Sequence, residues 1–296
     1  MASVSDELCG TVRIDWFIVR PYLYDCDQQY ARLVKVVAAM SKFFVVSDIH
    51  SFYTPLKTAL DAAGFDPNNK DHWLVVCGDA FDRGDESFEV LHFLMSLERK
   101  ILIRGNHEDL LEDCCRRGFP EWHDSSNGTR KTIQDIGGVG NGIAFDECCQ
   151  ITWDKMSGYR NLLVDYFETE KYIFVHGWIP CIKTKGLYDI DKYNPNWRKC
   201  NDSEWEDARW TNGIERAMDG IIEPGKTIVC GHWHCSLGHL YDAEDKFSAS
   251  EFGETAVWDP WYHDGCIAID RCTAHTGEVN VLVLEDEFLE GANGDD

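Results

Sequence analysis

The sequence predicts an α/β protein in which helices pack on a layered β-sheet, and two observations lead to this class. Short apolar runs recur along the chain, and each is typical of a buried strand. Stretches with apolar residues at helical spacing follow the first three runs, so strands and helices alternate. The runs are residues 43–46, 73–76, 101–103, 172–175 and 227–229.

Helices are expected directly after the first three runs. In residues 51–63, Leu56 and Leu60 recur at the spacing of one helical face. Residues 86–97 form the second expected helix, and residues 109–117 form the third. One apolar side of the second helix would be made by Phe88, Leu91, Leu94 and Met95.

The end of the chain predicts two more strands, at residues 265–270 and 279–285, with a turn near Gly277 between them. A sheet that includes them is expected to be mixed rather than purely parallel. The expected organisation is an N-terminal extension (residues 1–40), a catalytic domain (residues 41–287) and an acidic flexible tail (residues 288–296).

Two stretches interrupt the alternation of strands and helices. Residues 118–146 are rich in Gly and polar residues, and residues 183–223 hold tryptophans among charged residues. We expect both to be insertions over the mouth of a site, because loops in this position commonly control substrate choice. The tryptophans of the second stretch, which offer a surface for stacking a base, are Trp197, Trp205 and Trp210.

Composition narrows the possible partners. The chain has 28 Lys and Arg against 52 Asp and Glu, a net charge of -24, so no nucleic acid or anionic membrane is expected as a partner. The 13 cysteines are odd in number and include no Cys-x-x-Cys pair, which favours reduced thiols in a cytoplasmic protein. Without a signal-like leader or an apolar stretch of about 18 residues, neither secretion nor a membrane span is expected. Oligomeric state cannot be inferred from the sequence.

Short motifs rich in Asp, His and Asn follow the predicted strands. Because the carboxyl ends of strands in an α/β sheet are where sites are built, we expect these motifs to meet in one site. They are Asp48-Ile49-His50, residues 78–84, residues 104–108, His176-Gly177 and residues 231–234.

These motifs contain the ligands for two divalent metal ions. Asp48 and His50 alternate on an extended segment, so both can face one ion, and Asp79 could bridge two ions about 3.5–4 Å apart. Asn106, with an imidazole from His176 and from His232, could complete the second site. Mixed oxygen and nitrogen ligation favours Mn, with Fe or Zn as alternatives, over Ca.

The remaining polar residues of the motifs suit acid catalysis and phosphate binding. His107 lies next to Asn106 but points elsewhere, which makes it a candidate general acid that Asp82 would orient. Arg83 offers a planar fork for phosphate oxygens. No covalent nucleophile is evident, so attack by a metal-bridging hydroxide is the expected scheme.

The order of the motifs (DxH, GDxxDRG, GNHE, HG, GHxH) resembles the calcineurin-like metallophosphoesterases over roughly residues 41–287. Residues 78–84 and 104–108 resemble the phosphoprotein phosphatase branch, which includes bacterial and bacteriophage serine/threonine phosphatases and symmetrical diadenosine tetraphosphatases. The resemblance implies a four-layer β-sandwich flanked by helices, with a dimetal site at the strand ends. It assigns Asp48, His50 and Asp79 to the first metal. It assigns Asp79, Asn106, His176 and His232 to the second.

Four features depart from, or extend, that pattern. Ser51 stands where the family usually has Gly, and the pair before Asp82 is unusual. Protein phosphatases usually lack a counterpart of His234, which phosphodiesterases of the superfamily use as an extra ligand of the first metal. The family also implies a second phosphate-binding arginine, for which Arg209 is the first candidate and Arg216 the second.

The leading function is therefore a metal-dependent phosphomonoesterase resembling serine/threonine protein phosphatases, acting on a phosphorylated protein or a small phosphate ester. Arg83, Asn106 and Arg209 are its expected substrate-binding residues. Hydrolysis of a phosphoanhydride such as diadenosine tetraphosphate is the alternative, because residues 231–233 resemble that group. Phosphodiesterase activity is a third alternative, which rests on His234. A non-catalytic binding module is disfavoured, since every expected ligand is retained.

Overall fold

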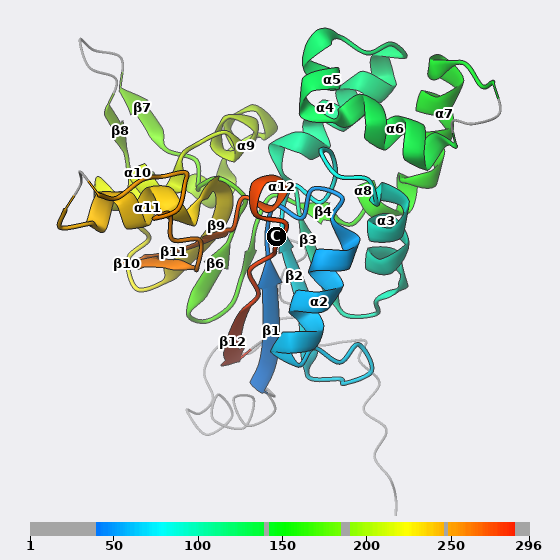
Figure 1. Ribbon diagram of the computed structural model, residues 1–296. Helices are drawn as coiled ribbons and strands as arrows, with labels where there is room; N and C mark the ends of the chain where they lie inside the picture. The colour runs from blue at the N-terminus through cyan, green and yellow to red at the C-terminus, as the bar shows by residue number, and fades with distance from the viewer. Residues whose placement is uncertain (1–39, 139–141, 185–189, 246–247, 288–296) are drawn as a thin grey trace, which may run out of the picture. The chain divides into compact units, whose positions relative to one another are not determined.

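A computed structural model describes residues 40–138, 142–184, 190–245 and 248–287 (Figure 1). Of the predicted N-terminal extension only Met40 is described, and the predicted tail lies outside the described residues. The described residues belong to one compact unit. Within them, no helix combines the length and the apolar character needed to cross a membrane.

The first sheet has the strand order β12-β1-β2-β3-β4. Four of its strands run parallel, and β12 pairs antiparallel with β1, with Met40 opposite Glu287 and Val45 opposite Leu282. The sheet is therefore mixed, as the sequence predicts. Its strands are β1 (Met40–Val46), β2 (His72–Cys77), β3 (Lys100–Ile103), β4 (Leu163–Val164) and β12 (Leu282–Glu287).

The second sheet has the order β10-β11-β9-β6-β5 and is also mixed. Its central strand β9 runs parallel to β11 and β6, and the two edge strands are antiparallel to their neighbours. The strands are β5 (Phe167–Glu168), β6 (Tyr172–Phe174), β9 (Thr227–His234), β10 (Trp261–His263) and β11 (Cys266–Asp270). A separate hairpin pairs β7 (Ile182–Thr184) with β8 (Ile190–Lys192).

The alternation of side chains along each strand produces four layers. In β1, Phe43 and Val45 point to one face and join Phe174 of the second sheet in a core between the sheets. Phe44 and Val46 point to the other face and join a core beneath the helices. The outer face of the second sheet packs against helices of its own. The expected sandwich of two sheets between helices is thus confirmed (Figure 1).

Helices follow the first three strands of the first sheet, as the sequence predicts, but the third begins at Asn106 and not at residue 109. Val90, Leu91 and Leu94 bury one face of the second helix, whereas Phe88 and Met95 are exposed, so the predicted apolar side was wrong for these two residues. The helices are α2 (Tyr53–Ala63), α3 (Ser87–Ser96) and α4 (Asn106–Arg117).

The first predicted insertion is helical, and its expected loop character was wrong. It holds α5 (Trp122–Asn127) and α6 (Thr129–Gly137), and α7 (Phe145–Lys155) with α8 (Ser157–Arg160) follows. The glycines that suggested a loop end the helices instead. Gly118, Gly128 and Gly138 adopt left-handed conformations with φ of 74°, 94° and 86°, at the ends of α4, α5 and α6.

The second predicted insertion also folds against the domain. Trp197 and Trp205 are buried, where they pack on Tyr166, so neither offers the stacking surface expected of it. Trp210 alone of the three is half exposed. The helices of this region and beyond are the 3-10 turn η1 (Trp197–Lys199), α9 (Asp202–Arg209), α10 (Gly213–Met218), α11 (Cys235–Asp242) and α12 (Thr273–Thr276).

Candidate active site

Strands of both sheets deliver the predicted ligands to one place. Each ligand lies within β9 or at most four residues beyond the end of β1, β2, β3 or β6. The side chains are almost completely buried, except that His232 and His234 are partly accessible. Two adjoining clusters of donor atoms share Asp79: His50, Asp79 and His107 in one, and Asp79, His176 and His232 in the other. His107 belongs to the first cluster, although the sequence predicts it as the acid and not as a ligand.

The first cluster is organised around His50. The Nδ1 atom of His50 lies 2.9 Å from the carbonyl oxygen of Phe81, which fixes the ring and turns Nε2 toward the cluster. That Nε2 lies 3.8 Å from Oδ1 of Asp48 and 3.8 Å from Oδ2 of Asp79. The other oxygen of Asp48 accepts a hydrogen bond of 2.9 Å from the backbone N–H of His232. Asp48 thereby joins the first cluster to strand β9.

The second cluster is organised around His176. Its Nδ1 lies 2.9 Å from the carbonyl oxygen of Cys77, and its Nε2 lies 2.8 Å from Oδ1 of Asn106. The same Nε2 lies 3.3 Å from Oδ1 of Asp79. Asp79 therefore presents one oxygen to each cluster.

The protonation behaviour of two of the imidazoles, His50 and His232, fits metal binding. Burial lowers the pKa of His50 to about 3 and that of His232 to about 4, which keeps both rings in the neutral form that binds metals. Burial opposes a charge on His176 as well, but Asp79 raises its pKa to about 10. Burial, with the nearby Asp270, raises the pKa of Asp48 to about 8. Carboxylates held this deeply are stabilised by a cation, so the donor set fits two divalent ions.

The predicted acid pair is present beside the first cluster. His107 Nδ1 lies 2.8 Å from Oδ2 of Asp82, which leaves Nε2 directed at the site. Burial would lower the pKa of His107, but the carboxylates of Asp79 and Asp82 raise it. The exposed Arg83 places Nη2 3.4 Å from His107 Nε2, so a cation and an imidazole face the same small space.

Asp82 has two further partners that the sequence analysis missed. Thr129 donates a hydrogen bond of 2.6 Å to Oδ2, and Thr132 donates one of 2.9 Å to Oδ1. Thr132 Oγ1 also accepts the backbone N–H of Asp82, at 3.0 Å. Both threonines lie on α6, and the only signal in the sequence was their spacing of three residues, which puts them on one helical face.

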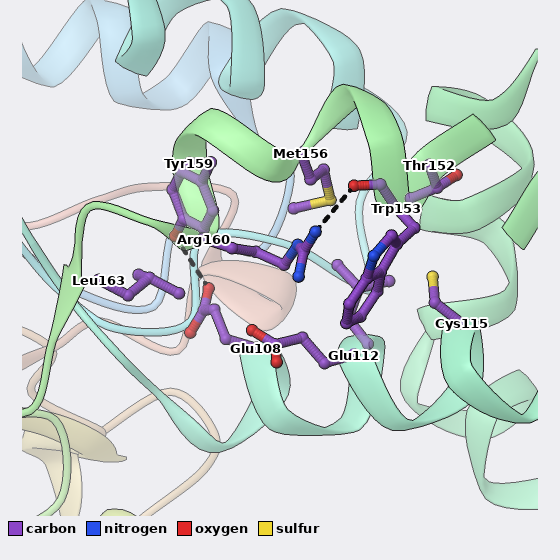
Figure 2. Close-up of a pocket in the computed structure, with 10 residues that line it drawn as sticks. Glu108, Glu112, Cys115, Thr152, Trp153, Met156, Tyr159, Arg160 and Leu163 are labelled. Carbon is purple, nitrogen blue, oxygen red and sulfur yellow. Dashed lines mark hydrogen bonds between the residues drawn. The ribbon is translucent and has the colours of Figure 1, made fainter. Parts of the chain in front are cut away.

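Glu108 is a second residue whose role was missed. Its carboxylate accepts the backbone N–H groups of Asp79 (3.0 Å), Ala80 (3.0 Å) and Gly105 (2.8 Å). Tyr159 donates a hydrogen bond of 3.2 Å to Glu108 Oε1 from the wall of a small pocket behind the site (Figure 2). Glu108 therefore ties two ligand-bearing loops to the helical layer. Its position three residues after Gly105, at a helix start, was the available signal.

Much of the site backbone is left-handed. Ser51, for which Gly was expected, adopts a φ of 60°, and its hydroxyl accepts a hydrogen bond of 2.9 Å from Ser87. Such conformations cost non-glycine residues about 1–2 kcal/mol each. The other site residues with positive φ are Asp48, His50, Asp79, Asp82, Arg83 and His232.

His234 lies beside the clusters rather than within them. Its Nδ1 is 3.6 Å from Oδ2 of Asp270, and its Nε2 is 3.3 Å from Oε1 of Glu251. Burial opposes its charge, but the bond to Asp270 raises its pKa to about 10. His234 as a metal ligand stays a prediction.

The two candidate phosphate arginines are engaged by carboxylates. Arg209 is buried and bonds to Asp109 (2.6 Å) and Asp165 (2.9 Å). Arg216 pairs with Asp191 at 3.2 Å and Asp219 at 3.0 Å. A phosphate contact from either arginine stays a prediction.

The family model for the calcineurin-like phosphoesterases matches residues 41–236. Curated relatives include a symmetrical bis(5'-nucleosyl)-tetraphosphatase of Pseudomonas fluorescens, 41% identical over 66 residues. Another, of Aeromonas hydrophila, is 42% identical over 64 residues. These matches span 22% and 21% of this chain, and 23% of each relative.

Solved structures that match this chain include a putative diadenosine tetraphosphatase. That match has a TM-score of 0.44 and 13% identity and covers 86% of this chain and 96% of the other. A protein serine/threonine phosphatase from Saccharomyces cerevisiae matches with a TM-score of 0.41 and 12% identity, over 86% of this chain and 82% of the other.

Proposed function

The chain belongs to the calcineurin-like phosphoesterase family, and we propose that within this family it is a phosphomonoesterase that acts on phosphorylated alcohols, as a serine/threonine protein phosphatase does. The buried His107–Asp82 pair carries the proposal. The alkoxide that leaves from phosphoserine or phosphothreonine is strongly basic and needs a proton in the transition state. The phosphate that leaves from an anhydride needs one far less.

The metal-binding residues divide between two ions. Asp48, His50 and Asp79 would hold the first, and Asp79 would share the second with a further set of ligands, Asn106, His176 and His232. Two divalent ions, of which Mn is the expected one and Fe or Zn the alternatives, would neutralise phosphate charge and activate the attacking water.

The protein's own residues position the ester and supply the proton. Arg83 is exposed beside the cluster, so its fork can bind two phosphate oxygens, and the Asn106 amide, whose Oδ1 lies 2.8 Å from His176 Nε2, is the other expected contact to the substrate. His107, held at Nδ1 by Asp82, presents the proton on Nε2 to the leaving oxygen. Arg209 could bind the substrate only if phosphate replaced Asp109 and Asp165 as partners of its guanidinium group.

Hydrolysis of a dinucleoside polyphosphate is the second candidate. Trp210 is half exposed, and its ring centre lies 5.9 Å from that of His232, so a base could stack beside the metal ligands. The relatives named as tetraphosphatases match in less than a quarter of their length, which makes this activity a proposal for the present chain. Because Trp197 and Trp205 are buried, they cannot stack a base, and only Trp210 of the three tryptophans supports this activity.

The deciding experiment compares p-nitrophenyl phosphate with its bis-ester, using Mn²⁺-supplemented protein and a chelator control. We expect monoester cleavage to dominate and the chelator to abolish it. A phosphoserine peptide and diadenosine tetraphosphate, at equal concentration, then separate the two candidates. Dominant cleavage of the bis-ester would refute the proposal and indicate a phosphodiesterase that uses His234.

A further inference from the structure

The carboxylate of Asp82 is held from two sides. His107 contacts Oδ2, and the hydroxyls of Thr129 and Thr132 donate to Oδ2 and Oδ1. All four residues are buried, and Thr129 and Thr132 have no exposed surface at all. A carboxylate out of contact with water needs such donors, because an unsatisfied charge there would be strongly destabilising. Both oxygens of Asp82 are thus occupied, and its plane is fixed.

The start of α6, where Thr129 lies, also fixes the backbone of Asp82 and Arg83. A Cβ added to Gly128 would lie 2.1 Å from the backbone nitrogen of Arg83 and 2.7 Å from its Cα. Gly128 therefore packs directly on the peptide that joins Asp82 to Arg83. Thr132 holds the N–H of that same Asp82.

Asp82 and Arg83 need such support because both are left-handed, with φ of 73° and 65°. Residues in this conformation persist only where the surroundings hold them. This support comes from a single stretch, residues 128–132. The Thr129 hydroxyl donates to Asp82, the Thr132 hydroxyl both donates to Asp82 and accepts its N–H, and Gly128 packs on the backbone.

We propose that Gly128, Thr129 and Thr132, which we term the α6 clamp, are positioning residues for proton donation by His107. This inference rests on the proposed phosphomonoesterase function. By fixing the plane of the Asp82 carboxylate, the clamp fixes the His107 ring, and so determines where Nε2 points. The α6 clamp acts through Asp82 and has no contact with the metal ligands in the interactions that the structure shows.

The test replaces the hydroxyls by methyl groups of equal size, in Thr129→Val, Thr132→Val and the double variant. Substrates with different leaving groups distinguish positioning from general damage. p-Nitrophenol leaves without help, whereas the serine of a phosphopeptide needs its proton. We expect roughly a 10- to 100-fold loss of kcat on the phosphoserine peptide for the double variant, and a much smaller loss on p-nitrophenyl phosphate. The loss on the peptide should be smaller than the roughly 10²–10⁴-fold effect of removing an acid completely, because His107 itself remains.

Two controls belong to the experiment. Thr129→Ser and Thr132→Ser keep the hydroxyls and should restore the peptide rate. Thr152→Val removes another buried threonine hydroxyl, which bonds to the carbonyl of Ile133 and not to the acid pair, and should leave the ratio of the two rates unchanged. An unchanged ratio of the two rates in the double valine variant, whether both rates fall equally or neither falls, would refute the positioning role of the α6 clamp.

A readout without turnover separates this inference from the proposed function. In metal-loaded wild-type protein, the proton that His107 Nδ1 shares with Asp82 should give a far-downfield proton NMR signal. Loss or displacement of that signal in the double valine variant, and its return in the serine variants, supports the α6 clamp even in a protein that cleaves no monoester. Wild-type protein that is inactive on both esters would refute the proposed function alone. An unchanged signal in the valine variant would refute the α6 clamp alone.

Discussion

His107 shows how much the role of a residue depends on its neighbours. A histidine at the start of α4 could serve as a metal ligand or as an acid, and its Nε2 does lie 3.9 Å from Asp79. The bond from its Nδ1 to Asp82 favours the acid, because the carboxylate sets the ring and stabilises the protonated form.

Replacing His107 with Asn should therefore reduce turnover of phosphoserine peptides by roughly 10²–10⁴-fold while both metals stay bound. Turnover and metal content, measured on the same preparation, check this expectation. Full activity would show that the acid lies elsewhere, and loss of one metal equivalent would show that His107 is a ligand.

Individual residues could be predicted where a motif also fixes their geometry. Asp48, His50 and Asp79 follow strands whose ends must meet, so their proximity follows from the fold class. Thr129 and Thr132 could not be found in this way, because their partner Asp82 lies about fifty positions earlier in the chain. The partners of Arg209 were hidden for the same reason, since Asp109 is 100 positions away.

At the scale of the elements, one ionic network connects the second sheet to the segment that follows β8. Arg198, on η1, bonds to Glu168 of β5 at 2.9 and 2.8 Å and to Glu223 at 3.0 Å, and Lys226 also reaches Glu168 at 3.0 Å. Burial would raise the pKa of Glu168, but the bonds to Arg198 and Lys226 lower it.

Glu168→Gln should consequently destabilise the protein by roughly 1–3 kcal/mol at pH 7. A carboxylate with a lowered pKa contributes stability above its ordinary value of 4.5, and this contribution is lost as the pH falls through the lowered value. The difference between wild type and variant in urea unfolding should therefore shrink below about pH 4.5. The exposed Glu170 supplies the matched control, Glu170→Gln. A difference that stays constant down to pH 3 would contradict the ionic explanation.

Elements were predictable where apolar spacing was clear and were missed where glycine obscured it. Ile133 and Ile136 of α6 are buried at helical spacing, but they stand between Gly128 and Gly138 in a polar stretch. A glycine that ends a helix and a glycine that belongs to a loop are the same letter in a sequence. Their difference lies in the hydrogen bonds around them, such as that from the Gly138 N–H to the Gln134 carbonyl.

At the scale of the whole domain, the proposed metal ligands connect the two sheets. Asp48 and Asp79 follow strands of the first sheet, whereas His176 follows β6 and His232 lies within β9 of the second sheet. An ion bound by all of them should resist separation of the sheets. A site without cations would leave carboxylates buried near one another, and burial first, then the neighbouring Asp270 and Asp79, raises the pKa of Asp48.

Metal removal should therefore lower thermal stability. At a metal concentration about 100 times its Kd, binding contributes about 2.7 kcal/mol, and the Tm should rise along a Mn²⁺ titration of chelator-treated protein. Asp79→Asn should lack most of this rise, since it disturbs both clusters. A Tm that is independent of Mn²⁺, or an equal rise in the variant, would argue against a metal site that joins the sheets.

The pairing of distant strands was the least predictable part of the fold. The sequence predicts the strand 279–285, but nothing local indicates that β12 lies antiparallel to β1, more than two hundred positions away. Strand patterns report which face is buried, not which neighbour buries it. The division into two facing sheets came from the family resemblance, and the alternating cores on either side of β1 confirm it.

The left-handed backbone of the site bears on how the protein would respond to directed evolution. Seven of the eight non-glycine residues with positive φ among those described are Ser51 and residues of the catalytic motifs. Glycine or asparagine tolerates this conformation better than most residues do. In a library selected for heat resistance alone, substitutions by glycine or asparagine at these positions would be enriched. The resulting proteins would be more stable but inactive. Selection for stability here has to be coupled to selection for turnover.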